Sequence, residues 1–237
     1  MRYYIYISDQ KVDMLLPQVP TQTKKRIAAE FAIDFKIFSI RRQIETLDND
    51  TRVSRLQAVE RHLRDNTKIG TIADPGAHWI AGQLPMHWGI CEVQYFSQTA
   101  KLACFVGQED SSYIVLCGSA QNVLSTTFPS EISGFSGSLA PSILAVLARE
   151  SEWIRTATNT RSIGGAIGTM DLLQLGVAEG EALEHLADLV EMQPGAVQEV
   201  EFLAKRLMSG RTIRHTHEAS REVPVILGTP LFVSQAD

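Results

Sequence analysis

The clearest pattern in the chain is an alternation of short β-prone runs with turn residues between Ile69 and about Ser125. The runs are GICEVQYF, AKLACFVG and SYIVLCGS. They are rich in β-branched, aromatic and cysteine residues, and the segment GQEDSS (107–112) between the last two is typical of a hairpin loop. This region therefore predicts an antiparallel β-meander in the middle of the chain.

Strand-like segments also stand near both ends of the sequence. Residues 2–8 (RYYIYIS) are rich in Tyr and Ile, a composition favoured in strands. Residues 33–40 (IDFKIFSI) alternate polar and apolar positions, which predicts a second strand. Residues 223–234 (VPVILGTPLFVS) predict one or two closing strands.

Helical spacing of apolar residues marks several other segments. Thr21 or Thr23 can cap a helix that runs to about Phe31. An amphipathic helix that ends near Arg64 is predicted from four apolar positions: Val53, Leu56, Val59 and Leu63. In the second half of the chain the pattern predicts helices over 141–155, 170–175, 181–192 and 196–208.

Together these elements predict an α+β fold. We expect a single domain over residues 1–237 with a central, largely antiparallel sheet, a β-meander in the middle, and helices in the N-terminal third and the C-terminal half. A subdivision into a basic β-α-β-α part (1–68) and a part with the meander and the later helices (69–237) is the alternative.

The composition is that of an ordinary globular protein. Of the 237 residues, 44% are hydrophobic and 21% are charged, which excludes a disordered, collagen-like or membrane-bundle chain. The longest mostly apolar run is about ten residues, half of what a bilayer span needs. The three cysteines, Cys91, Cys104 and Cys117, fit small buried hydrophobes in a reducing compartment. We therefore expect a cytoplasmic protein without a secretory signal or membrane segment.

The formal charge of -5 is unevenly distributed along the chain. Residues 1–70 carry 13 Lys and Arg against 9 Asp and Glu, a net +4, and residues 71–237 carry 9 against 18, a net -9. The two regions could simply attract each other inside one fold. Alternatively, the first third could bind an anion. An excess of four charges and a pI of 5.7 argue against nucleic acid as a partner but allow a small phosphorylated ligand.

The first candidate site is the segment SDQK, which follows the first predicted strand. Ligands often bind beyond the carboxyl ends of strands. Ser8 and Asp9 could donate or accept hydrogen bonds there, and Lys11 could pair with a phosphate as a point charge. A solvated surface turn is the alternative.

The second candidate site consists of two His-Trp pairs, His78-Trp79 and His87-Trp88, on either side of Pro85. Aromatic and imidazole groups could form a stacking pocket for a base or a sugar. The alternative is that both tryptophans pack in the core and the histidines bind backbone carbonyls.

Other motifs carry less weight. His215 and His217 could present a His-x-His metal pair if their segment is extended, but no remote third ligand is evident. Ser136 in GFSGS lacks the second glycine of a nucleophile elbow, and SIGGAIG (162–168) does not fit a dinucleotide-binding loop. We therefore expect no catalytic residue, no metal and no cofactor.

Five motifs together resemble an uncharacterised bacterial family of similar length. They are KVDMLLPQVP (11–20), PMHWG (85–89), YFS (95–97), LCGSAQNVLS (116–125) and LGTPLFV (227–233). They extend over nearly the whole chain, so the resemblance implies one domain in a bacterial cytoplasmic protein and no particular activity. Asn122 stands where the family motif has His, and Gln98 where it has Gly. A function that depends on that His is therefore not carried over.

These features favour a non-catalytic binding or sensor module for a small anionic, nucleotide-like ligand. One alternative is an interaction or scaffold protein that self-associates or docks on a partner, because the helices predicted from 170 to 208 carry apolar stripes. Another is a phosphoester hydrolase that uses Lys11 or His87, although spacing alone assembles no nucleophile and base. A cavity lined together by Lys11, Trp79 and Trp88 would favour ligand binding, and separated positions would favour a scaffold.

Overall fold

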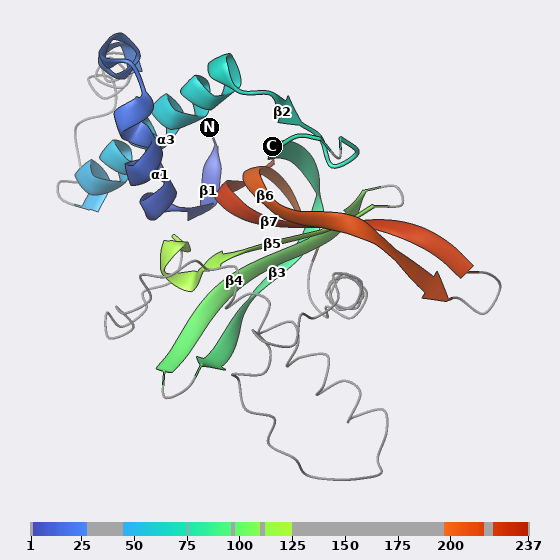
Figure 1. Ribbon diagram of the computed structural model, residues 1–237. Helices are drawn as coiled ribbons and strands as arrows, with labels where there is room; N and C mark the ends of the chain where they lie inside the picture. The colour runs from blue at the N-terminus through green and yellow to red at the C-terminus, as the bar shows by residue number, and fades with distance from the viewer. Residues whose placement is uncertain are drawn as a thin grey trace.

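The computed structural model describes residues 2–27, 45–74, 76–95, 98–109, 112–124, 197–215 and 220–236 (Figure 1). Its elements in chain order are β1 (Tyr3–Ile7), α1 (Asp9–Leu15), the 3₁₀ helix η1 (Leu16–Gln18), a helical stretch at 21–27, α3 (Glu45–Asn66), β2 (Ile69–Gly70), β3 (Trp79–Tyr95), β4 (Gln98–Glu109), β5 (Ser112–Ser119), the 3₁₀ helix η2 (Ala120–Asn122), β6 (Gln198–His215) and β7 (Ser220–Gln235).

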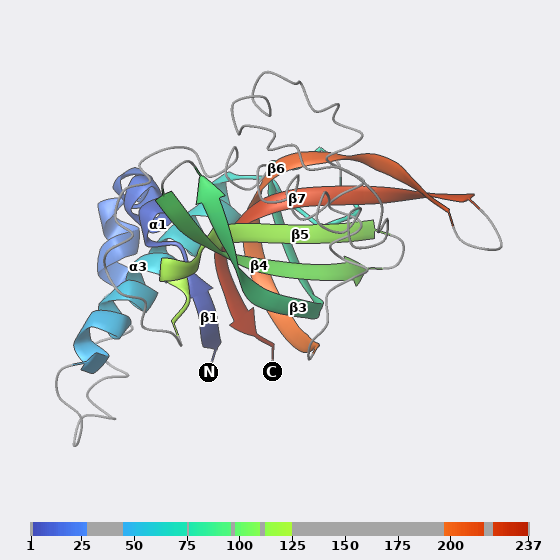
Figure 2. The same cartoon turned by 90° about the horizontal axis from the view of Figure 1, so that it is seen from below.

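Five of the strands pair in a closed ring. β3 is antiparallel to β4, and β4 is antiparallel to β5. β5 runs parallel to β7, β7 is antiparallel to β6, and β6 returns antiparallel to β3. β1 extends the sheet along β7, and the short β2 lies parallel to the start of β3. Figure 2 shows β3, β4, β5 and β7 side by side, with β6 beyond β7. The ring is therefore a small mixed β-barrel.

The order of the strands around this barrel is that of the OB-fold. Counted along the chain from β3, the strands follow one another as first, second, third, fifth and fourth, and the third and fifth are the parallel pair. OB-folds bind oligonucleotides and oligosaccharides on the outer face of their second and third strands. In this chain that face belongs to β4 and β5, and the side chains at its centre are apolar and buried: Leu102, Cys104, Val106, Val115 and Cys117.

The interior of the barrel is filled by a cluster of buried side chains from all five strands of the ring. Phe105 lies at its centre, stacked on Trp88 at a centroid distance of 5.8 Å and meeting Tyr6 of β1 edge-on at 6.0 Å. The other members include Ile80, Met86, Ile114, Leu116, Phe202, Ala204, Ile226 and Val233. Successive residues of a strand point to opposite faces, so alternate positions supply this core.

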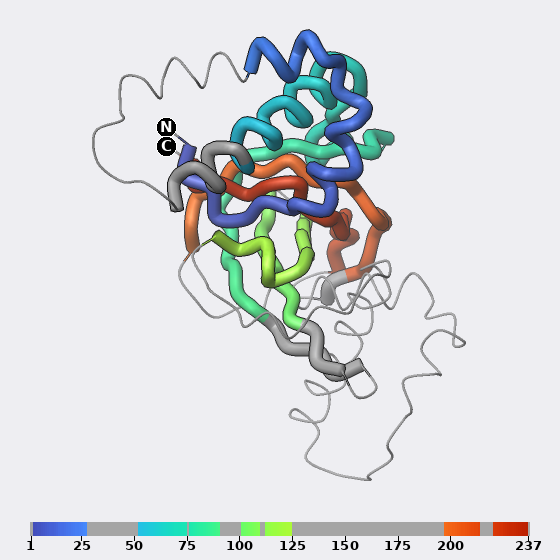
Figure 3. Tube along the Cα trace, turned by 90° about the vertical axis from the view of Figure 1, so that its left-hand side faces the viewer, coloured from blue at the N-terminus to red at the C-terminus, as the bar shows by residue number. Residues whose placement is uncertain are grey.

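A second core forms where α1 and α3 cover the outside of the barrel. Figure 3 shows the two helices together on one side of the strands. Val12 of α1 and one face of α3 pack against outward-facing residues of β1, β3, β6 and β7. The α3 residues are Leu56, Ala58, Val59 and Leu63, and the strand residues include Ile7, Trp79, Leu203, Leu231 and Phe232. Apolar burial on this scale is the main force that holds the helices to the barrel.

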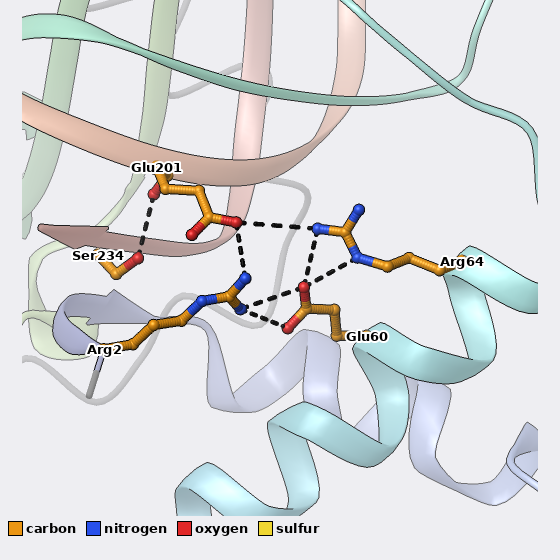
Figure 4. Close-up of polar contacts among 5 residues, drawn as sticks. All are labelled: Arg2, Glu60, Arg64, Glu201 and Ser234. Carbon is orange, nitrogen blue, oxygen red and sulfur yellow. Dashed lines mark hydrogen bonds and ion pairs between the residues drawn. The ribbon is translucent and has the colours of Figure 1, made fainter. Parts of the chain in front are cut away.

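An ion-pair cluster links α3 to the end of the barrel where the two termini lie (Figure 4). Glu60 of α3 accepts hydrogen bonds from Nη1 of Arg2 at 3.0 and 3.2 Å and from Nε of Arg64 at 3.0 Å. Arg2 also donates to Glu201 of β6 at 2.7 Å, and its guanidinium lies 5.5 Å from the centroid of the Phe232 ring. The Glu60 side chain is only 9% exposed, so these interactions are partly shielded from water.

The predicted meander is confirmed, because β3, β4 and β5 are consecutive antiparallel neighbours. The predicted closing strand is the single strand β7, and the helix expected to end near Arg64 lies within α3. The sheet is mixed: five of the seven described strand pairings are antiparallel and two are parallel. The α-helices α1 and α3 lie in the first third of the chain, so the described part has an α+β architecture.

The helix predicted over 196–208 is wrong, because residues 198–208 belong to strand β6. Phe202 points into the barrel while the next residue, Leu203, packs outside against the helices. A strand with apolar residues on both faces loses its period of two and can be mistaken for a helix.

Several predicted elements lie outside the described residues. They are the strand at 33–40, the end of the helix to Phe31, the helices at 141–155, 170–175 and 181–192, Ser136, the loop 162–168 and His217.

Candidate functional site

Lys11 lies at the centre of a polar site between α1 and β7. Its Nζ donates hydrogen bonds to Oγ1 of Thr229 at 2.7 Å and to Oγ of Ser8 at 3.2 Å. Ser8 is the last residue before α1 and is 3% exposed, and Thr229 is 6% exposed. Lys11 itself is partly buried, and its amine is held by two buried hydroxyls.

A second lysine, Lys205 of β6, stands beside this site. Lys205 is the register partner of Thr229 on one side and of Trp79 on the other. Paired residues of neighbouring strands share a face of the sheet, so these three form a row across the outer face of the barrel. Trp79 is 8% exposed and belongs to the core beneath the helices, which closes one end of the row.

Burial and the neighbouring charge of Lys205 lower the pKa of Lys11 to about 8. Burial makes the larger contribution because a charged ammonium loses hydration when it is enclosed. Among the described residues, neither Lys11 nor Lys205 is paired with a carboxylate. Two cations without an acidic partner form a site of positive potential.

A chain of hydrogen bonds leads from Lys11 into the barrel. Ser8 is hydrogen-bonded to the hydroxyl of Tyr6, which also accepts a bond from Nδ2 of Asn122 at 3.1 Å. Tyr6 is fully buried, and burial raises the pKa of its phenol to about 12. The Tyr6 hydroxyl lies directly over Gly118, where any side chain would collide with it. Asn122 thus has a defined structural partner in the Tyr6 hydroxyl.

Asp9 is turned away from Lys11. It pairs with Nε of Arg52 on α3 at 2.6 Å, and the same guanidinium donates to the carbonyl oxygen of Ile7 at 3.0 Å. Arg52 therefore joins α3 to the end of β1 and the start of α1. The segment SDQK was expected to be a loop, but Ser8 is the residue that precedes helix α1, and the other three residues lie in its first turn.

The structure separates the two His-Trp pairs. Trp79 lies in the row beside Lys205, and His78 next to it is exposed, with its carbonyl accepting the Arg206 amide at 2.8 Å. Trp88 packs against the barrel interior, on Phe105, and its Nε1 donates to Gln198 at 3.0 Å.

Trp79 and Trp88 are nine residues apart on β3. Because this number is odd, their side chains point to opposite faces of the strand. His87 lies eight residues beyond Trp79 on β3, about 26 Å of extended chain. The described residues therefore do not form the expected pocket with both pairs.

Three residues of the site were missed from the sequence, Thr229, Lys205 and Tyr6, and Asn122 was named only as a departure from the motif that it stands in. Thr229 comes to Lys11 from 218 residues away, so no local spacing could indicate it. The motif LGTPLFV contains Thr229, but its sequence predicts only a closing strand and does not indicate a neighbour for Thr229.

Among the described residues, no three His, Cys, Asp or Glu side chains come together as metal ligands. Within those residues, no helix combines the length and the apolar character needed to cross a bilayer.

These features define a small mixed β-barrel protein with helices packed on one side and a lysine-centred polar site where β1, β6 and β7 meet α1. The chain belongs to DUF7019, a family of unknown function, whose model matches residues 2–237. This membership confirms the expectation of an uncharacterised family that the five motifs raised. No curated protein and no solved structure shows significant similarity to the chain.

Proposed function

We propose that this protein is a non-catalytic binding or sensor module for a small anionic ligand, and that the ligand binds at Lys11. The observation that carries the proposal is the pair of lysines, Lys11 and Lys205, beside the hydroxyls of Ser8 and Thr229. An anion placed there would offset the repulsion between the two ammonium groups and accept hydrogen bonds from both hydroxyls. A phosphate or carboxylate group fits these donors, and a nucleotide-like ligand is one source of it.

The composition of the site supports a small ligand rather than nucleic acid. The outer face of β4 and β5, which OB-folds use for oligonucleotides, carries buried apolar side chains such as Val106 and Val115. The cations at Lys11 form a compact pair, whereas tracking a nucleic-acid backbone requires a stripe of cations.

Thermal unfolding at low ionic strength tests the proposal directly. Inorganic phosphate, nucleotides and cyclic nucleotides should raise the melting temperature of the wild type, because a ligand that binds only the folded state stabilises it. Lys11→Met and Lys205→Met should lose the shift. Lys25→Met is the matched control, since Lys25 is exposed on the helical stretch 21–27 and the substitution removes the same charge. No shift with any phosphorylated compound would refute the proposal.

The alternative is an interaction protein that self-associates or docks on a partner. The separation of Trp88 from Lys11 favours it, because these side chains do not line one cavity. Light scattering over a range of concentrations tests it: a concentration-dependent mass supports the alternative, and a constant monomer mass opposes self-association.

A further inference from the structure

The amine of Lys11 differs chemically from an ordinary surface lysine. Its Nζ lies against two neutral oxygens, Oγ1 of Thr229 at 2.7 Å and Oγ of Ser8 at 3.2 Å, and against no described carboxylate that would hold the proton. The nearby ammonium of Lys205 and the partial burial both favour the uncharged amine. An uncharged amine has a free electron pair, and lysines next to another cation are activated in this way for attack on carbonyl carbons.

We propose that Lys11 forms a reversible imine with a small carbonyl compound that also carries an anionic group, such as a 2-oxo acid or a phosphorylated aldehyde. This rests on the anion site proposed above and specifies the class of its ligand. Lys205 would hold the anionic group, and the carbonyl carbon would lie at Nζ of Lys11. The ligand would therefore be both bound and covalently retained.

The reaction balances without an oxidant or a reductant. The electron pair of Nζ forms a carbon–nitrogen bond as the carbonyl double bond opens onto its oxygen. One proton moves from nitrogen to that oxygen, and loss of water then gives the imine. The hydroxyls of Ser8 and Thr229 lie against Nζ, where they can relay this proton, and Ser8 connects in turn to the buried Tyr6.

The charged groups around Lys11 determine how its reactivity depends on pH. Lys205 faces it from β6, and Tyr6 reaches it from β1 through Ser8. Asp9 on the same helix is paired with Arg52 of α3 at 2.6 Å. No free carboxylate among these groups restores the charge of the amine, so reactivity should rise through about pH 8, well below the range of an exposed lysine.

Borohydride trapping with glyoxylate as the probe tests the proposal. Sodium cyanoborohydride donates a hydride to the imine carbon and leaves a stable secondary amine that peptide mass mapping can locate. At pH 7 the Lys11 peptide should be labelled at least about 10-fold faster than the Lys25 peptide, since each pKa unit changes the uncharged fraction about tenfold. Glycolate, which has the same charge but no aldehyde group, should slow the labelling of Lys11.

Variants separate this proposal from the simpler anion site. Lys11→Arg keeps the positive charge but cannot form an imine, so it should keep the thermal shift with phosphate and lose the label at position 11. Lys205→Met should reduce the labelling advantage of Lys11, and Lys25→Met should leave it unchanged. Circular dichroism establishes that each variant is folded.

Two results would overturn the imine. One is labelling of Lys11 no faster than that of Lys25 while phosphate still shifts the wild type, which leaves the anion site standing. The other is fast labelling of Lys11 that glycolate does not slow, which shows a reactive amine without the anion-bearing ligand class proposed here. The absence of any phosphate shift is a different outcome, and it refutes the proposed function on which the inference rests.

Discussion

Neutralising Glu60 should destabilise the protein far more than neutralising a carboxylate in a surface ion pair. Glu60→Gln keeps the shape of the side chain but removes the charge that holds Arg2 and Arg64. Hydrogen bonds to charged groups contribute about 1.5–3 kcal/mol each. The side chains of Arg2 and Arg64 are 38% and 44% exposed, so water screens part of this energy. We therefore expect a loss of about 2 kcal/mol in the free energy of unfolding, less than the sum of the two contacts.

Urea unfolding, followed by circular dichroism and tryptophan fluorescence, measures this loss. The midpoint should fall with the slope unchanged, because the surface exposed on unfolding stays the same. The melting temperature should fall by roughly 4–8 °C, given about 2–4 °C per kcal/mol for a chain of this size. One molar salt should leave much of the difference in place, since Glu60 is shielded.

Glu222→Gln is the matched control for Glu60. Glu222 pairs with Arg211 at 2.9 Å, but the two side chains are 57% and 63% exposed. Such pairs contribute about 0–1 kcal/mol, so the control should change stability by less than about 0.5 kcal/mol. Equal effects of the two substitutions would refute the reasoning that burial of Glu60 makes its ion pairs strong.

Three further predictions concern the barrel and the polar site. Burial raises the pKa of Tyr6 from 10.0 to about 12, so the unfolded state loses the phenol proton at a lower pH than the folded state does. The free energy of unfolding of the wild type should therefore fall as the pH rises between these two values. Urea midpoints measured over this range should fall less for Tyr6→Phe than for the wild type. The pKa of Lys11 is lowered from 10.5 to about 8, so between these pH values the unfolded state binds more protons than the folded state. The free energy of unfolding of the wild type, relative to that of Lys11→Met, should therefore rise with pH over this range. A difference between the two proteins that does not change with pH would contradict the lowered pKa. Phe105→Ala should cost about 3–5 kcal/mol by leaving a cavity inside the barrel, whereas Tyr3→Ala, at a side chain that is largely exposed, should cost little in the same assay.

Part of the fold could be read from local patterns. The meander could be predicted because turn residues separate β4 from β5 and the two strands pair as neighbours in the sequence. Closure of the barrel could not be predicted from the sequence. The barrel closes because β3 pairs with β4 on one side and with β6 on the other, and at Met86 it pairs with both, through Gly107 and Gln198. A hydrophobic pattern shows which residues are buried but does not show which remote strand buries them.

Some residues of the candidate site could be predicted from the sequence and others could not. Lys11 could be found because it follows a strand and lies in the more basic third of the chain. Its hydroxyl partner Thr229 and its like-charged neighbour Lys205 come from the last two strands, and only the barrel brings them together. Trp88 was expected to line a stacking pocket, but it packs against the interior of the barrel. The local sequence, an aromatic residue next to His, is the same in both situations and does not distinguish them.

The closed ring also determines the order in which the chain can fold. β3 acquires its second neighbour with β6, β5 acquires its second neighbour with β7, and β1 pairs with β7, so these three pairings form only after residues 198–235 have been synthesised. Contacts between such distant parts of a chain form slowly because a long loop must close first. During synthesis β5 carries an open edge until β7 emerges, and open edges promote association between chains. A truncation before Ser220 would remove β7, with which β1, β5 and β6 all pair, and we expect such a fragment to aggregate rather than to fold.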